Sequence, residues 1–244
     1  YTGRLRRSVS FMLGVQNFYV PLFEEALEAE GVPLELKYLP VVESAFDPMA
    51  TSHVGAAGLW QFMVPTAKHY GMTVNSLIDE RRDPIKSSRA AAKYLKDLYN
   101  SFGDWTLAIA AYNCGRNNVL KAIKRAGGAR DYWAIYPYLP RETRGYVPAF
   151  IAANYVMNYY CDHKIPAMKT IAPAETDTVV VTRSLHLGQV AAACNLDFET
   201  VQAMNPQYRT GVVPGNAQPC ALRLPMTAID RFLQLGDSVY HLTP

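Results

Sequence analysis

The hydrophobic pattern of the first two thirds of the chain has the period of α-helices. Between Ile85 and Phe102, Ala91, Leu95 and Leu98 recur at three- and four-residue spacing with polar residues between them, which is typical of an amphipathic helix. Glycines and prolines stand near the ends of most such segments, where they stop or start helices. The pattern predicts helices over residues 1–31, 34–46 (kinked or restarted at Pro40), 65–71, 85–102, 105–112, 116–126 and 141–161, with loops at 48–63 and 132–140.

The pattern changes after residue 165. Residues 166–175 contain two prolines and several small residues, which predicts a linker. Residues 176–226 then predict a strand, two short helices and a second strand, a unit too small for an enzyme but suited to binding. We therefore expect a mainly α protein, in which a helical domain over 1–165 precedes a small α+β (βααβ) module, and we make no prediction for the tail 227–244.

Composition narrows the class of protein. Half of the 244 residues are hydrophobic and the net charge is only +3, which is ordinary for a globular protein and too small to suggest nucleic acid. No apolar run reaches the length of a membrane span. Cys194 and Cys220 fall in the same small module, and we expect them to form a disulfide.

One carboxylate stands out as a candidate catalyst. Glu43 follows Val41 and Val42 and precedes Ala45 and Phe46. Apolar surroundings disfavour the charged form, so we expect a raised pKa and a carboxyl that can donate a proton near neutral pH, as acid cleavage of a glycosidic bond requires. The chain has no nucleophile elbow, no metal-ligand spacing and no phosphate-binding glycine loop, so we expect no metal and no cofactor. Its 16 Tyr and three Trp offer flat aromatic faces, which suit the binding of sugar rings.

Four segments of the chain resemble, in their order along it, the goose-lysozyme-related lytic transglycosylases of bacteria. Their sequences are most similar to those of the membrane-bound lytic transglycosylase D type. The resemblance spans roughly residues 15–160. The segments are Glu43-Ser44 with Ala45-Phe46-Asp47-Pro48, Gly55-Ala56-Ala57-Gly58-Leu59-Trp60-Gln61, Ala111-Tyr112-Asn113-Cys114-Gly115, and Glu142-Thr143-Arg144-Gly145-Tyr146-Val147-Pro148.

The second region resembles a LysM module, a peptidoglycan-binding fold. Arg183-Ser184-Leu185 replaces the Gly-Asp-Thr that usually follows the first strand of such modules. The residues that carry the resemblance are Val179 to Val181, Leu187, Val190-Ala191, Leu196, Val201, Asn205-Pro206 and Leu222-Arg223-Leu224-Pro225.

The resemblance implies a lysozyme-like fold and a mechanism with one carboxylate. Glu43 would protonate the oxygen between N-acetylmuramic acid and N-acetylglucosamine, and would then take the proton of the 6-hydroxyl that attacks the anomeric carbon and closes a 1,6-anhydro ring. The motifs offer no second acid, and none is needed, unlike in most glycosidases. Substrate contacts are expected from Ser44, Gly58, Gln61, Tyr112, Asn113 and Tyr146.

Three alternatives stay open. A lysozyme-like muramidase would hydrolyse the same bond with water, a non-catalytic protein would only bind the cell wall, and a chitinase-like enzyme would cleave glycans that lack the lactyl group. The expected partner is the peptidoglycan glycan strand. The resemblance implies the bacterial periplasm, with outer-membrane anchoring of the full-length protein, and we expect a monomer.

Overall fold

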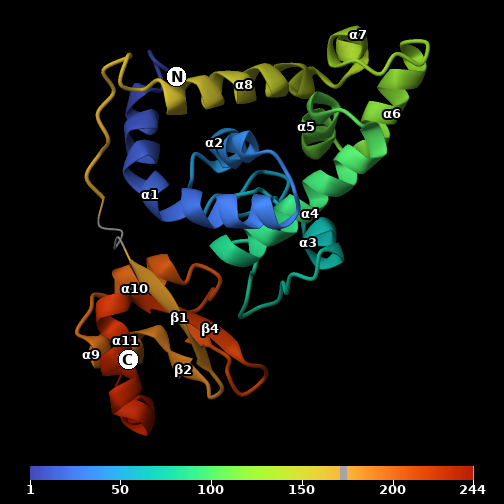
Figure 1. Ribbon diagram of the computed structural model, residues 1–244. Coiled ribbons are helices and arrows are strands. Elements are labelled where there is room, and N and C mark those ends of the chain that lie inside the picture. Colours follow the sequence, from blue (N-terminus) through green and yellow to red (C-terminus); the bar gives the residue numbers. More distant parts are fainter. Residues whose placement is uncertain (171–174, 244) are drawn as a thin grey trace.

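The structure, a computed structural model, describes residues 1–170 and 175–243, and Figure 1 shows two units that follow each other along the chain. Each unit has its own hydrophobic core. The first core runs from Val9 to Ile165, and the second is built from Val181 to Val239 together with Ile78. The first core excludes water from the helices that carry Glu43, and burial of such apolar surface is the main stabilising contribution to a fold.

The first unit is helical throughout. Helices α1 and α5 pack on the long helix α4, and α8 packs on both α2 and α5. The elements are α1 (Arg6–Ala29), η1 (Leu34–Tyr38), α2 (Leu39–Ser44), α3 (Val64–His69), α4 (Pro84–Phe102), α5 (Trp105–Cys114), α6 (Arg116–Arg125), α7 (Tyr132–Ile135), η2 (Tyr136–Tyr138) and α8 (Arg141–Asn158).

These elements confirm most of the predicted helices and refine three segments. The predicted helix 34–46 is a 3₁₀ turn followed by α2, with Pro40 in the first turn of α2, where a missing backbone N–H costs nothing. The aromatic loop 132–140 contains α7 and η2, which are too short to produce a periodic pattern. Helix α8 continues through Pro148. None of the helices in the described residues is both long and apolar enough to cross a membrane.

Helix α2 ends abruptly just after the candidate acid. Ala45 and Phe46 both have positive φ, 52° and 63°, a conformation that costs an L-residue roughly 1–2 kcal/mol. The ring of Phe46 is 1% exposed and packs edge-on against Phe23, with ring centres 5.7 Å apart. Burial of this ring offsets the backbone strain and fixes the end of the helix that carries Glu43.

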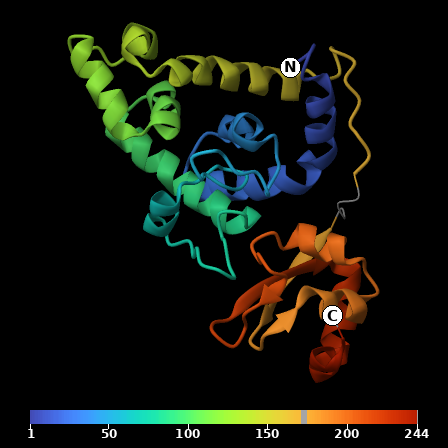
Figure 2. The same ribbon diagram turned by 180° about the vertical axis from the view of Figure 1, so that it is seen from behind.

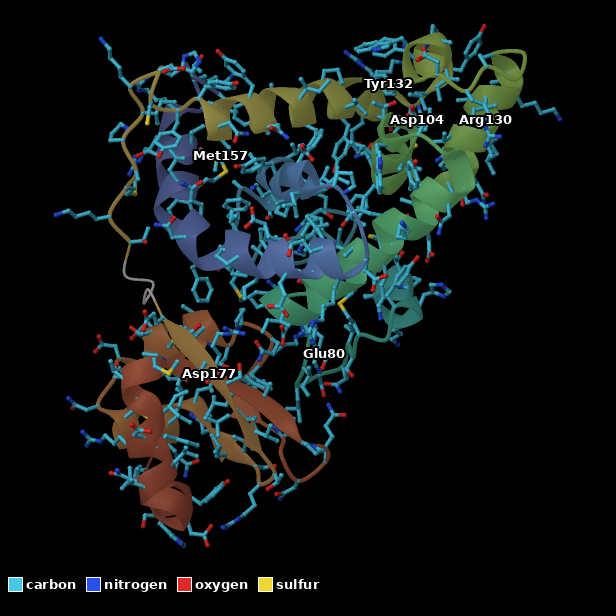
Figure 3. All side chains as sticks on the ribbon, in the orientation of Figure 1. Glu80, Asp104, Arg130, Tyr132, Met157 and Asp177 are labelled. Atoms are coloured by element: carbon cyan, nitrogen blue, oxygen red, sulfur yellow. The ribbon has the colours of Figure 1, made fainter. Side chains whose placement is uncertain are left out.

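Polar side chains position the helix that faces α2. The Tyr132 hydroxyl donates to the carbonyl of Arg144 at 2.8 Å, which ties α7 to the first turn of α8. Asp104 caps α5 by accepting from the N–H of Leu107. Figure 3 shows Asp104 and Tyr132 at the end of the unit where α5, α6 and α7 meet, whereas Met157 lies near the other end of α8.

The second unit is a small α+β module. Strands β1 and β4 pair antiparallel, with Thr178 opposite Arg223, which confirms the predicted strand–helix–helix–strand order. The elements are β1 (Thr176–Val181), β2 (Leu185–His186), α9 (Leu187–Cys194), α10 (Phe198–Met204), β3 (Val212–Val213), β4 (Cys220–Pro225), α11 (Met226–Leu235) and η3 (Gly236–His241).

Two features of this module differ from expectation. The tail left without a prediction forms α11 and η3, which place Ala228, Phe232 and Val239 in the second core. The expected disulfide is wrong, because Cys194 and Cys220 are separate buried thiols. Cys194 instead faces the carbonyl of Ala228 at 3.8 Å, so it serves as a small apolar packing residue of α9.

The loop between α3 and α4 joins the two units, and both ribbon views show it reaching toward the module (Figure 1 and Figure 2). The backbone N–H of Asp79 donates to the carbonyl of Gln207 at 2.8 Å, and the N–H of Arg209 donates to the carbonyl of Leu77 at 2.9 Å. Ile78 is buried in the module's core. Backbone hydrogen bonds on both sides of a buried side chain fix the register of this junction.

The described part of the predicted linker packs on α1. The N–H of Met168 donates to the carbonyl of Ser10 at 2.8 Å. A Cβ at Gly14 would lie 2.2 Å from the Met168 carbonyl oxygen, so only glycine permits this contact. Residues 171–174 of the predicted linker lie outside the described residues, and the domain borders stay a prediction.

Candidate active site

A groove of about 380 Å³ opens beside Glu43. Its walls come from the loop before α3, from the end of α5 and from the first turn of α8. The lining residues are Glu43, Ser52, Val54, Ala56, Gln61, Phe62, Met63, Thr66, Tyr94, Tyr112, Asn113, Cys114, Gly115 and Glu142. Of the seven residues expected to form the site, four line the groove, and Ser44, Gly58 and Tyr146 do not.

Glu43 is partly buried at the base of this groove. Its carboxylate accepts a hydrogen bond from the hydroxyl of Tyr146. Burial raises the pKa of Glu43 from 4.5 to about 7, the Tyr146 hydrogen bond opposes this rise, and the charge of Glu142 adds to it. Burial is the largest cause, as the apolar neighbours in the sequence predicted. At neutral pH a large fraction of this carboxyl therefore holds a proton.

Two tyrosines next to the acid stay protonated. Burial and the nearby Glu43 charge raise the pKa of both Tyr146 and Tyr112 well above 10. Tyr146 therefore remains a hydrogen-bond donor to Glu43 throughout the neutral range. The hydroxyl of Tyr112 donates to the Trp60 carbonyl at 2.7 Å, which leaves its ring as the part that lines the groove.

The side-chain amides of Gln61 and Asn113 each use one of their two polar groups in a hydrogen bond within the protein. Gln61 has φ of 49°, and its Nε2 donates to the carbonyls of Gly58 at 2.9 Å and Ala50 at 3.2 Å. Asn113 accepts from the Thr143 hydroxyl through its Oδ1 at 2.8 Å. Within the described residues, no hydrogen bond reaches the Oε1 of Gln61 or the Nδ2 of Asn113. The groove thus offers one amide acceptor and one amide donor.

The structure gives Ser44 and Gly58 other roles than the expected sugar contacts. The Ser44 hydroxyl lies 2.9 Å from the Leu59 carbonyl and 3.1 Å from that of Pro40, so it binds backbone and not Glu43. At Gly58, a Cβ would lie 1.8 Å from the carbonyl oxygen of Arg81. Glycine is needed there because two backbone segments touch, and its contact with a sugar ring stays a prediction.

Arg81 holds the loop that forms one wall of the groove. Its Nε and Nη2 donate to the two carboxylate oxygens of Asp79, each at 2.8 Å. Its Nη1 donates to the backbone carbonyls of Gly55 and Phe62. Burial alone would raise the pKa of Asp79, but the hydrogen bonds and charge of Arg81 hold it below its ordinary value. The run of charged residues from Asp79 to Asp83 gives no sign in the sequence of this contact with the groove wall.

Glu142 is the site residue that the sequence analysis missed. It lies in the first turn of α8, is exposed, and lines the groove with Glu43. The motifs were expected to offer no second acid, but the side chain of Glu142 lines the same groove as Glu43. A signal existed, because Glu142 and Tyr146 are four residues apart and a helix places such residues on the same face.

The two neighbours of Glu43 predict opposite shifts of the pH profile. Tyr146→Phe removes a hydrogen bond to the charged form, so the pKa of Glu43 should rise and the alkaline limit of activity should move up by about one pH unit. Glu142→Gln removes a like charge, so this limit should move down, by only a few tenths of a unit because Glu142 is exposed. Rates of the expected peptidoglycan cleavage, taken between about pH 5 and 9, measure both shifts. Shifts in the same direction would contradict this assignment of causes.

Comparisons with known proteins give relatives for both units. Residues 21–135 match the family described as "Transglycosylase SLT domain", and residues 175–241 match "Lytic transglycosylase MltD, LysM-like domain". The membrane-bound lytic murein transglycosylase D of Escherichia coli strain K12 is 32% identical over 217 residues, which cover 87% of this chain and 47% of that protein. The chain thus spans about half the length of this relative.

Further relatives are soluble enzymes. The soluble lytic murein transglycosylase of the same strain is 33% identical over 128 residues, covering 50% of this chain and 20% of that protein. The crystal structure of the 70 kDa soluble lytic transglycosylase from Escherichia coli aligns with a TM-score of 0.51 and 30% identity, covering 59% of this chain and 24% of that one. Its complex with bulgecin A aligns with the same TM-score and 29% identity, covering 63% of this chain and 26% of that one.

Proposed function

We propose that this chain, which carries a transglycosylase SLT domain followed by an MltD-type LysM-like domain, cleaves peptidoglycan as a lytic transglycosylase. The bond cleaved is the β-1,4 bond between N-acetylmuramic acid and N-acetylglucosamine, and the product ends in 1,6-anhydro-N-acetylmuramic acid. The similarity to enzymes named as lytic murein transglycosylases supports this choice of reaction and polymer.

The observation that carries the proposal is the state of Glu43. Its pKa of about 7 lets the same carboxyl be protonated in one step and ionised in the next at neutral pH. A general acid that must later act as a base works best when its pKa lies near the operating pH. Tyr146 stabilises the ionised form through its hydrogen bond, so neither protonation state is strongly disfavoured.

The reaction uses this carboxyl twice. Glu43 first donates its proton to the glycosidic oxygen, the bond from that oxygen to the anomeric carbon breaks, and N-acetylglucosamine leaves as an alcohol. The 6-hydroxyl of the muramic acid residue then attacks the anomeric carbon and gives its proton to the Glu43 carboxylate. The carboxyl is restored, one C–O bond has replaced another, and no water is consumed.

The groove supplies groups that could orient the sugar. The Nδ2 of Asn113 can donate to an acetamido carbonyl, and the Oε1 of Gln61 can accept from a hydroxyl or an acetamido N–H. The ring of Tyr112 offers an apolar face to the C–H groups of a sugar. Tyr146 acts through Glu43. Ser44 and Gly58 shape the loop that precedes α3, through their contacts with backbone carbonyls.

A second candidate reaction is hydrolysis of the same bond. Glu142 supports it, because a second carboxylate in the groove could hold and activate a water molecule. A lysozyme-like muramidase would then release reducing N-acetylmuramic acid. The raised pKa of Glu43 suits both reactions, since each begins with protonation of the glycosidic oxygen.

Product analysis separates the two reactions. Purified peptidoglycan sacculi are digested with this protein at pH about 6.5, between the ordinary pKa of a carboxyl and that of Glu43, and the soluble products are analysed by mass spectrometry. We expect anhydromuropeptides, which are lighter by one water molecule than the products of hydrolysis. Products with reducing ends alone would establish the muramidase, and no release of glycan would leave a wall-binding protein.

The relatives also suggest where the protein works. Several relatives are named membrane-bound lytic murein transglycosylases, so we infer that this chain acts on peptidoglycan in the bacterial cell envelope. Anchoring to the outer membrane and a monomeric state remain predictions. We likewise keep residues 166–175 as the proposed border between a catalytic domain and a peptidoglycan-binding module.

A further inference from the structure

A second pocket, of about 250 Å³, lies where the two units meet. The first turns of α4 form one side, and the strands β1 and β4 with the residues after α10 form the other. Figure 3 marks this junction by Glu80 on the helical unit and Asp177 on the module. The polar residues that line the pocket are Asp83, Lys86, Arg89, Thr178, Gln207 and Arg223.

Arg223 is buried in this pocket without an anionic partner. Its side chain belongs to β4 and the residue is 9% exposed. Its Nη1 donates to the Thr176 hydroxyl at 3.0 Å, but within the described residues no carboxylate oxygen lies within 4 Å of it. Burial lowers the pKa of Arg223, and the charges of Asp83 and Asp177 oppose this. A guanidinium stays charged in proteins, and burying it without a partner is costly.

Gln207 has an unused hydrogen-bonding group at the same place. It is 5% exposed, and its Oε1 is the one buried side-chain nitrogen or oxygen in the described residues that has no hydrogen-bond partner. Its backbone carbonyl is already used by the N–H of Asp79. Because rotation of an amide exchanges its oxygen and its NH₂ group, Gln207 can present either an acceptor or a donor to the pocket.

The other charged groups that line the pocket are bound to partners of their own. Lys86 is paired with Glu80, and Arg89 lies 3.3 Å from Glu25. The carboxylate of Asp83 accepts from the first backbone N–H groups of α4, at 2.9 Å each. Arg223 is therefore the cation of this pocket whose charge has no partner in the described residues, and an anion would satisfy it.

We propose that this pocket binds a carboxylate of a peptidoglycan stem peptide, an assignment that rests on the proposed function. A guanidinium binds a carboxylate through two parallel hydrogen bonds, and the amide of Gln207 can add a third. In peptide-bearing peptidoglycan the glycan backbone is uncharged, whereas the stem peptides carry free carboxylates. The pocket volume suits the end of a peptide better than a disaccharide, so the module would recognise the peptide while the groove holds the glycan.

The test compares matched variants in a protein that cannot turn over its ligand. Every sample carries Glu43→Gln, and calorimetry measures binding of a disaccharide tetrapeptide and of the free tetrapeptide. Arg223→Met should weaken both affinities at least about tenfold, as expected for a charge-assisted hydrogen bond. Arg231→Met, which removes an equal charge from the exposed face of α11, should change neither.

Stability distinguishes a ligand site from a structural role. Removing a buried, unpaired charge should leave the melting temperature of Arg223→Met unchanged or higher. If this variant fails to fold, Gln207→Met provides the same comparison at the second group of the pocket, with a smaller loss of affinity expected. A folded variant of either kind that binds both peptides like its parent overturns the proposal.

Two further ligands identify the source of the anion. A tetrasaccharide of N-acetylglucosamine, which carries no carboxylate, should bind independently of Arg223, and inorganic phosphate should not compete with the tetrapeptide at equal concentration. Dependence of glycan binding on Arg223, or displacement of the peptide by phosphate, overturns the assignment to stem peptides. Because binding is measured without turnover, its failure is separate from failure of the proposed reaction, which appears as missing anhydromuropeptides with intact Glu43.

Discussion

Glu43→Gln should lower the rate of peptidoglycan cleavage by three orders of magnitude or more. Both proton transfers pass through this one carboxyl, and general acid–base catalysis by a positioned group contributes about 10²–10⁴-fold for each role. Glutamine has nearly the same shape and can still accept the hydrogen bond from Tyr146, but it cannot donate a proton to a glycosidic oxygen. The measurement is the initial rate of soluble product release from sacculi, for the variant and for the unchanged protein.

A stability measurement serves as the control for this variant. The pKa of Glu43 is raised in the folded state, from 4.5 to about 7. Its contribution to stability is therefore fully present below about pH 4.5 and is lost as the pH rises through about 7. Relative to Glu43→Gln, the unchanged protein should lose up to about 3 kcal/mol of unfolding free energy over this range, less any solvent screening.

Two outcomes would contradict the role of Glu43. If the glutamine variant cleaves sacculi at an undiminished rate, the acid must lie elsewhere in the groove, and Glu142 becomes the first residue to replace. If urea unfolding gives the same pH dependence for both proteins, the carboxyl is more hydrated than its position indicates. Loss of activity together with a lost pH dependence supports the assignment.

The sequence predicts the acid well because its environment is local. The apolar residues on both sides of Glu43 lie in the same turn and a half of chain, so they indicate burial before any fold is known. Tyr146 lies 103 residues further on, and only the motif resemblance placed it near Glu43. The hydrogen bond between them depends on how α8 crosses α2, which a periodic pattern does not specify.

What the sequence could not predict depends on contacts between distant segments. Arg81 binds the Gly55 and Phe62 carbonyls of the groove wall, yet its neighbourhood in the sequence resembles a surface charge cluster. The tail after residue 226 has helical spacing but no turn signal that ties it to a core. Its helix α11 becomes recognisable as part of the module once β1 and β4 are paired and offer it an apolar face.

Gly58→Ala should destabilise the first unit strongly, and this separates packing from substrate contact at a residue expected to touch a sugar. The new Cβ would lie 1.8 Å from the Arg81 carbonyl oxygen, at a φ of 85°. Neither the backbone of Arg81 nor its guanidinium can move without breaking the hydrogen bonds to the groove wall. We expect a loss of about 3 kcal/mol or more in unfolding free energy, measured by urea denaturation, with activity falling in proportion to the folded fraction.

Gly55→Ala is the matched control. Gly55 lies in the same loop at a φ of 87°, but a Cβ there meets nothing within 4 Å. The alanine should therefore cost only the left-handed backbone conformation, roughly 1–2 kcal/mol. If Gly58 instead served to admit a sugar ring, the two alanine variants would unfold at similar urea concentrations, and Gly58→Ala would differ only by a higher KM. A clear gap between their midpoints, with KM unchanged in the fraction that stays folded, means that Arg81 and not the substrate requires glycine at this position.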